Sequence, residues 1–236
     1  MGQTLSAFWD QTYFIPQPIF TGEDIPDQTG KVHIITGGYT GIGLELVKLV
    51  YPKNATIYIA GRNTEKGLKA VKAVKSEFPA SKGRLEFLKL DLADLSTIKA
   101  SVEEFLRKEE RLDVLTNNAG IMVPRKGSKS KQGHDLQTAT NIYGPFLFTS
   151  LLLPLFKRTV SLSNTGSVRV TWASSFAIEI MAPKGGVEFG DDGLVKDLAP
   201  EPSYGQSKAA NVMLGVETAR RWGDGGIISN VSGFFG

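Results

Sequence analysis

The chain has 236 residues, of which 41% are hydrophobic and 22% are charged. This length and composition are typical of one globular domain. There is no cysteine, which excludes disulfides and thiolate chemistry, and neither of the two histidines has a partner at metal-ligand spacing. The net charge of +3 is too small and too dispersed for a nucleic-acid-binding surface. We therefore expect no metal and no nucleic-acid partner.

Residues 1–30 contain no Lys or Arg, which argues against a secretory signal. We expect them to form an N-terminal arm whose aromatic residues, Phe20 among them, pack on a domain of residues 31–236. The first six residues, beginning Met1-Gly2, match an N-myristoylation pattern, but no basic segment supplies a second membrane signal. We favour a packed arm in a cytoplasmic protein with no stable membrane span. A weak membrane association through an acylated Gly2 is left open.

From residue 31 onward, strand signals alternate with helix signals. Short apolar runs predict strands at residues 32–35, 55–60, 84–89, 114–117, 167–174 and 227–231. Helical spacing of apolar residues predicts a helix ending at residue 50 and helices at 65–78, 96–108, 132–157 and 204–222. Ser96 is the expected N-cap of its helix, and the polar stretches 125–133 and 183–202 are expected loops. This order predicts an α/β fold with a doubly wound parallel sheet, the Rossmann fold.

The first predicted strand leads into a loop that contains Gly37, Gly41 and Gly43, and a helix follows. Strand, glycine loop and helix in this order are the context of a dinucleotide-binding loop. Gly37 permits the tight turn, Gly41 lets the backbone approach a pyrophosphate, and Gly43 lets the helix pack on the strand. For this loop alone, an ordinary glycine-rich turn remains the alternative.

The second predicted strand ends at Gly61-Arg62. A protein that binds NAD usually places an acid here to accept from the ribose 2′-hydroxyl, whereas an arginine suits the 2′-phosphate of NADP. The planar guanidinium can hold a phosphate through two parallel hydrogen bonds. The sequence therefore favours NADP over NAD, and the alternative is a solvated arginine at a strand end.

Tyr204 and Lys208 lie four residues apart on one face of the last predicted helix. The phenol of a free tyrosine holds its proton too tightly to exchange it readily at neutral pH. A nearby ammonium group stabilises the phenolate, so such a pair can act as acid or base toward a carbonyl or an alcohol. Taken alone, this spacing is common by chance.

The order of motifs resembles the compact short-chain dehydrogenase/reductase family, and within it the retinol-dehydrogenase-like and WW-domain-oxidoreductase-like enzymes. The resemblance rests on six motifs in order along residues 17–231: Thr36-Gly37-x-x-x-Gly41-x-Gly43, Asp91-Leu92, Asn117-Asn118-Ala119-Gly120, Asn141, Ser174-Ser175 and Tyr204-x-x-x-Lys208. The long interval between Ser175 and Tyr204, which contains residues 182–186 (APKGG), also fits that branch.

The resemblance implies an oxidoreductase that interconverts a carbonyl and an alcohol on a small or apolar substrate. It implies that Tyr204 exchanges the proton, Lys208 stabilises the phenolate and holds the nicotinamide ribose, Ser175 binds the substrate oxygen and Asn141 positions a water. The cofactor contacts that it implies are Thr36, Gly37, Tyr39, Thr40, Gly41, Ile42, Gly43, Arg62, Asp91, Leu92, Asn118, Ala119, Gly120, Tyr204 and Lys208. Two alternatives stay open: Ser174 faces the substrate in place of Ser175, or Asn141 is only an interior polar residue. A homodimer is compatible with the sequence.

After the sixth predicted strand, residues 232–236 end the chain without the Pro-Gly turn, substrate lid and seventh strand that the family pattern continues with. We therefore expect a C-terminally incomplete domain in which cofactor binding exceeds turnover. A second hypothesis follows, a truncated dinucleotide-binding protein of little or no activity. A serine hydrolase is excluded, because there is no Gly-x-Ser-x-Gly elbow and no suitably placed histidine.

Overall fold

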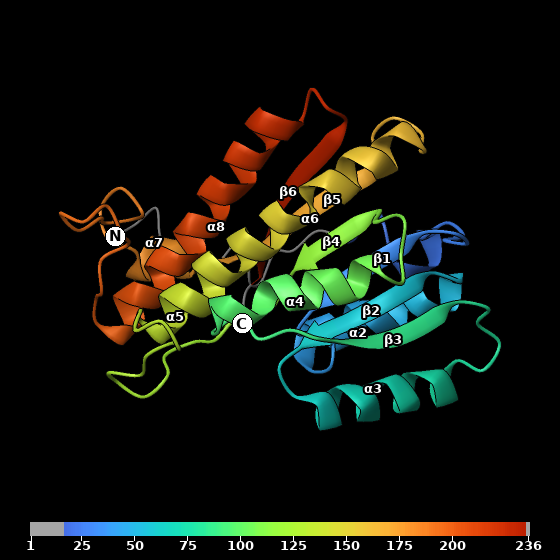
Figure 1. Cartoon of the computed structure of the whole chain (residues 1–236), viewed down its shortest axis with the longest axis horizontal. Helices are drawn as coiled ribbons and strands as arrows, with labels where there is room; N and C mark the ends of the chain where they lie inside the picture. The colour runs from blue at the N-terminus through green and yellow to red at the C-terminus, as the bar shows by residue number, and fades with distance from the viewer. Residues whose placement is uncertain (1–16, 235–236) are drawn as a thin grey trace.

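A computed structural model describes residues 17–234 as a six-stranded parallel sheet with helices on both faces (Figure 1). Along the sheet the strands run in the order β3-β2-β1-β4-β5-β6. Their bounds are β1 (Val32–Thr36), β2 (Thr56–Gly61), β3 (Arg84–Lys89), β4 (Val114–Asn117), β5 (Val168–Ser175) and β6 (Ile227–Phe234). The order reverses between β1 and β4, which is where a doubly wound sheet opens a crevice at its carboxyl edge. The predicted Rossmann fold is confirmed.

Two hydrophobic clusters lie on the two faces of the sheet. One joins β1 to helices α4 (Leu95–Leu106) and α6 (Gly144–Ser161), and the other joins it to α2 (Gly41–Val50) and α3 (Thr64–Glu77). Strand β1 is buried along its whole length, which explains its near-continuous apolar sequence. Five shorter helical segments and the long helix complete the fold: η1 (Gly22–Asp24), η2 (Tyr51–Lys53), α5 (Leu136–Thr138), η3 (Ala139–Tyr143), α7 (Ala177–Met181) and α8 (Pro200–Trp222).

The long helix predicted at 132–157 is wrong at its start. Residues 128–136 form a hairpin instead, with Lys129 paired to Asp135, and the helix begins at Leu136. It then widens into a π-turn, η3 (Ala139–Tyr143), in which the N–H group of Gly144 bonds to the carbonyl of Ala139 five residues earlier. Asn141 lies inside this turn.

Other boundaries also differ from the prediction, β6 ending at Phe234 instead of residue 231 among them, and two helix starts have a clear physical reason. Helix α4 is capped by Asp94, not by Ser96, because the Asp94 carboxylate accepts the Ser96 N–H at 3.2 Å. Helix α8 begins at Pro200, because proline at the first helical turn has no N–H group that the helix would leave unpaired.

The segment before β1 is held against the end of α2. The carbonyl of Lys53 accepts from the Gln28 N–H at 2.7 Å, and the Asn54 amide donates to Asp27 at 2.8 Å. The side chain of Phe20 is 65% exposed, so the packing predicted for this aromatic is wrong. The acylation pattern at Gly2 lies outside the described residues.

The continuous helical stretch Leu136–Ser161 is long and apolar enough, by length and composition alone, to cross a membrane. In the fold, 56% of its most apolar window is buried, with Phe148, Leu152 and Phe156 in the core. This stretch therefore packs as a core helix does.

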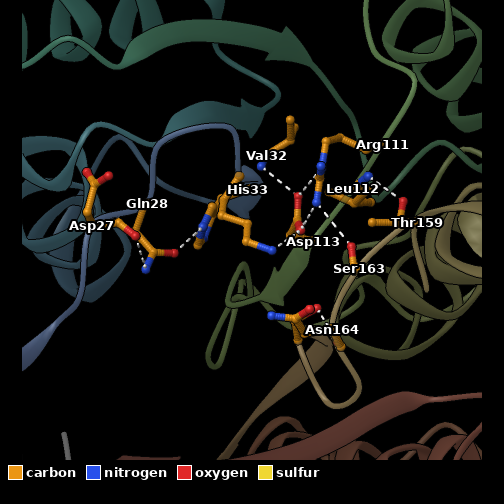
Figure 2. Close-up of polar contacts among 12 residues, drawn as sticks. Asp27, Gln28, Val32, His33, Arg111, Leu112, Asp113, Thr159, Ser163 and Asn164 are labelled. Carbon is orange, nitrogen blue, oxygen red and sulfur yellow. Dashed lines mark hydrogen bonds and ion pairs between the residues drawn. The ribbon is translucent and has the colours of Figure 1, made fainter. Parts of the chain in front are cut away.

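Asp113 lies at the amino edge of the sheet and is 1% exposed. Figure 2 shows its carboxylate among its partners. Its carboxylate accepts from Arg111 Nε and Nη2 at 2.8 and 2.6 Å, from Lys31 Nζ at 3.1 Å and from the Val32 N–H at 2.9 Å. Burial alone would raise the pKa of the Asp113 carboxyl, but the hydrogen bonds from Arg111, Val32 and Lys31 outweigh it and keep that pKa below its usual range. The contacts join β1 to the segment that enters β4.

Candidate active site

The glycine loop forms the tight connection between β1 and α2. Gly37 and Gly41 have φ angles of +68° and +53°, a region that L-residues with side chains rarely adopt. A Cβ atom on Gly43 would lie 2.5 Å from the Asn118 amide nitrogen and 2.7 Å from the Gly37 carbonyl oxygen. Only glycine therefore allows the start of α2 to sit this close to the loop and to the turn after β4.

The Thr36 side chain ties the ends of β1 and β4 together. Its hydroxyl accepts from the N–H groups of Asn118 and Ala119 at 3.0 and 2.9 Å, and donates to the Thr116 carbonyl at 3.3 Å. The Asn118 amide donates in return to the Thr36 carbonyl at 2.9 Å. These bonds hold the glycine loop and the Asn118–Gly120 turn on opposite sides of one crevice.

That crevice is a cleft of about 360 Å³ at the carboxyl edge of the sheet. The structure brings twelve of the predicted cofactor residues together in its lining: Thr36, Gly37, Tyr39, Thr40, Gly41, Ile42, Arg62, Asp91, Leu92, Asn118, Ala119 and Gly120. Gly43, Tyr204 and Lys208 do not line it. The sequence reasoning did not name the lining residues Ala60, Leu90, Ala93, Ile121 and Thr140, although most of them stand beside a strand end that it had identified.

At the far end of the cleft, the ring of Tyr39 lies against Gly61. A Cβ atom on Gly61 would come within 2.2 Å of Tyr39 Cε1, so an aspartate or glutamate at this position would displace the ring. The guanidinium of Arg62, next along the chain, forms no ion pair with the part of the chain that the structure describes. Its carbonyl accepts from the Lys89 ammonium, which brings a second cation to this rim.

Tyr204 and Lys208 lie in the first turns of α8, with Lys208 Nζ 5.6 Å from the centre of the Tyr204 ring. Lys208 is 6% exposed and donates to the Ala173 carbonyl of β5 at 3.1 Å. Burial lowers the pKa of the Lys208 ammonium from 10.5 to about 8. A Cβ atom on Gly120 would lie 3.5 Å from Lys208 Nζ, so this amine faces the wall of the cleft. The pair predicted from spacing therefore stands beside the cleft.

Asn141 is buried and braces the turn after β4 against α8. Its Oδ1 accepts the Ile121 N–H at 2.9 Å, and its Nδ2 donates to the Ile121 carbonyl at 2.9 Å and to Ser207 Oγ at 3.0 Å. All of these bonds link Asn141 to residues next to the cleft or next to Lys208. Asn141 is thus engaged with the site through its amide.

The two serines at the end of β5 have different surroundings. Ser174 is buried, and its hydroxyl donates to the Lys208 carbonyl at 3.2 Å. Ser175 is half-buried, and its hydroxyl accepts the Ala177 N–H at 3.2 Å, which leaves its proton free to donate. Of the two, Ser175 has the hydroxyl suited to a substrate oxygen.

Comparisons with known proteins agree with this geometry. A family model described as short chain dehydrogenase matches residues 31–201. A short-chain dehydrogenase/reductase of Emericella nidulans is 47% identical over 204 residues, which is 86% of this chain and 65% of that protein. A short-chain dehydrogenase/reductase of Phomopsis amygdali is 44% identical over 221 residues, 93% of this chain and 65% of that protein. The chain therefore spans about two thirds of the length of these relatives.

Solved structures share the fold. An uncharacterised protein from Mycobacterium paratuberculosis superposes with a TM-score of 0.70 at 28% identity, covering 91% of this chain and 71% of that one. The Pseudomonas aeruginosa protein RhlG, solved in complex with NADP, gives a TM-score of 0.66 at 24% identity over 86% of this chain and 71% of that one.

Proposed function

Because the chain belongs to the short-chain dehydrogenase family, we propose that it is an NADP-dependent oxidoreductase that interconverts a carbonyl and an alcohol. The observation that carries the proposal is the buried Lys208 ammonium, which lies near both the Tyr204 ring and the Gly120 wall of the cleft. The resemblance to retinol-dehydrogenase-like enzymes supports a small or apolar substrate.

The residues of the cleft fit a dinucleotide. The positive φ angles of Gly37 and Gly41 leave the loop without side chains where a pyrophosphate would approach. The Thr40 side chain makes no capping bond to the first turn of α2 within residues 17–234, so the N–H groups of that turn can face an anion. We assign the pyrophosphate to this loop, the adenine to Asp91 and Leu92, and the nicotinamide ribose to Lys208. Such a cofactor, when bound, supplies the hydride of the reaction.

The cations at the rim support the preference for the phosphorylated cofactor. Arg62 has no acidic partner among residues 17–234, and Lys89 stands beside its backbone. The ring of Tyr39 fills the space that an acidic side chain at position 61 would need. A 2′-phosphate would gain a charge-assisted contact with Arg62, whereas positions 61 and 62 offer a ribose hydroxyl no carboxylate to donate to.

The proton is handled by Tyr204. The buried Lys208 ammonium lies 5.6 Å from the centre of the Tyr204 ring, on the helix that carries both residues. The Ser175 hydroxyl, held in place by the Ala177 N–H, donates to the substrate oxygen. Tyr204 then gives a proton to that oxygen during reduction and removes it during oxidation.

The test is oxidation of NADPH, followed by absorbance, with a panel of aliphatic and aromatic aldehydes and ketones. Tyr204→Phe keeps the ring and removes the exchangeable proton, so kcat should fall by a factor on the order of 100 or more. The Kd of NADPH, measured by fluorescence, should stay within about twofold, because phenylalanine keeps the ring and the substitution removes only one hydroxyl.

Two results would contradict the proposal. Equal turnover by wild type and Tyr204→Phe would remove the proposed proton donor. Tight binding of NADPH by the wild type without turnover of any carbonyl would favour the second hypothesis, a dinucleotide-binding protein without catalysis.

A further inference from the structure

The segment that joins Ser175 to Tyr204 contains a small β-hairpin, residues 188–196. Phe189 pairs with Val195 in antiparallel fashion, and the N–H of Lys196 donates to the carbonyl of Glu188 at 2.9 Å. The hairpin lies beside the first turns of α8, in the orange loop at one end of the molecule (Figure 1). The hairpin is therefore connected along the chain to two proposed catalytic residues, Ser175 before it and Tyr204 after it.

The base of the hairpin is closed by a side chain from α8. A hydrogen-bonded antiparallel pair normally exchanges two N–H···O bonds, but residues 188 and 196 share only one. In place of the second, the Glu188 N–H donates to Gln206 Oε1 at 2.8 Å, and Gln206 Nε2 donates to the Lys196 carbonyl at 3.0 Å. Gln206 is 0% exposed. A primary amide can accept from one strand through its oxygen and donate to the other through its nitrogen.

A second contact holds the hairpin at Val195. The Val195 N–H donates at 2.9 Å to the hydroxyl of Tyr143, the last residue of the π-turn that contains Asn141. Gln206 lies between Tyr204 and Lys208 in the sequence, and Tyr143 lies two residues after Asn141. Both anchors of the hairpin therefore come from the elements that carry the proposed catalytic groups.

The hairpin itself presents apolar surface. The side chains of Phe189 and Leu194 are 63% and 44% exposed, although the backbone between them is fixed by the Gly190 N–H bond to the Leu194 carbonyl at 2.8 Å. An ordered backbone with exposed apolar side chains is suited to contact an apolar ligand.

We propose that Gln206 is a positioning residue that docks the hairpin of residues 188–196 onto α8, and that the docked hairpin forms one wall of the entrance for an apolar substrate. The role of the hairpin as a wall of the substrate entrance rests on the proposed function. The docking of the hairpin by Gln206 does not depend on it.

The test compares Gln206→Met, which keeps length and volume but loses both hydrogen bonds, with Tyr143→Phe, which loses only the hydroxyl. Hydrogen–deuterium exchange of the peptides that cover residues 187–198 is measured in the full chain. Loss of two hydrogen bonds should speed exchange there by a factor on the order of 10 in Gln206→Met, and by a smaller factor in Tyr143→Phe.

The matched control is Thr159→Val. Thr159 is also fully buried and also makes two hydrogen bonds, to the Leu112 N–H and the Leu155 carbonyl, but it lies on α6 far along the sequence from the hairpin. This variant should leave exchange of residues 187–198 unchanged. If the hairpin exchanges at the wild-type rate in both Gln206→Met and Tyr143→Phe, the docking role is overturned.

The proposed role of the hairpin as a wall of the substrate entrance is tested by steady-state kinetics with the best carbonyl substrate of the wild type. In Gln206→Met, KM for that substrate should rise about three- to tenfold, while kcat and the Kd of NADPH stay within about twofold. A fall in kcat with unchanged KM would mean that Gln206 acts on Tyr204 and that the hairpin is not a substrate wall. Absence of turnover in the wild type would overturn the proposed function and the wall, whereas the exchange measurement would still decide the docking.

Discussion

His33 should make the folding stability of this protein depend on pH in the range where most other groups do not titrate. It is the second residue of the buried strand β1 and is 7% exposed. Its Nε2 is 3.2 Å from the Gln28 side-chain oxygen, and Figure 2 shows the two side chains facing each other. Burial lowers the pKa of its imidazole from 6.5 to about 4, although the nearby Asp113 carboxylate acts in the opposite direction.

The sign and size of the pH effect on folding stability follow from the linkage between protonation and folding. Because the pKa of His33 is lower in the folded chain than in the unfolded chain, the unfolded chain binds a proton first as the pH falls. Its contribution to stability is therefore complete above pH 6.5 and decreases as the pH falls toward 4. The loss is about 2 kcal/mol between pH 7 and pH 5 and about 3 kcal/mol by pH 4.

The perturbation is His33→Val, which removes the titrating ring and places a β-branched residue in a buried strand. Urea unfolding at pH 7, 6 and 5 gives the free energy of unfolding at each pH. The decrease from pH 7 to pH 5 should be smaller in this variant than in the wild type by about 2 kcal/mol. His134→Gln removes the other histidine and should retain the wild-type decrease. An unchanged decrease in His33→Val would refute the reasoning.

Two further predictions concern the cofactor and the fold. Arg62→Ala should weaken NADP binding by a factor on the order of 10 or more and leave NAD binding within about twofold, because only the 2′-phosphate loses a charge-assisted contact. Calorimetry with both cofactors measures the two affinities, and an equal loss for both would contradict the prediction. Asp113→Ala should lower the free energy of unfolding by about 3 kcal/mol, because two cations and the Val32 N–H lose a buried partner. The control is Asp197→Ala, which breaks the exposed pair with Lys129 and should lower the free energy of unfolding by less than about 1 kcal/mol. Equal losses of unfolding free energy in the two variants, measured with urea, would show that the burial of Asp113 does not matter.

The strands could be predicted from the sequence because the sheet is buried on both faces. Short runs such as residues 84–89 and 114–117 match β3 and β4 residue for residue. The start of the helix before Asn141 could not be predicted, since residues 128–136 are held as a hairpin by distant partners. The Lys129 ammonium pairs with Asp197, and the Ser203 hydroxyl donates to Asp135 at 3.0 Å. Helical periodicity contains no information about such contacts.

The cleft was also largely predictable, because its polar residues and glycines follow directly after strands β1 to β4. The apolar members of the lining, Ala60 and Leu90, were missed because a strand-end alanine or leucine has no distinctive chemistry. The different surroundings of Ser174 and Ser175 could not be predicted, since the Ser174 hydroxyl donates to a backbone carbonyl 34 residues away. The role of Gln206 could not be predicted either, because its partners Glu188 and Lys196 belong to a segment whose sequence indicates only a polar loop.

The π-turn at residues 139–143 has a consequence for engineering of this scaffold. An α-helix advances about 100° per residue, and the π-turn accommodates one residue more than an α-helical turn would. Removing one residue between Leu136 and Asn141 would let the helix close as a regular α-helix, and Asn141 would then point about 100° away from Ile121. A deletion library across this helix should therefore contain well-folded but inactive members, in which the asparagine is present and only its angular position has changed.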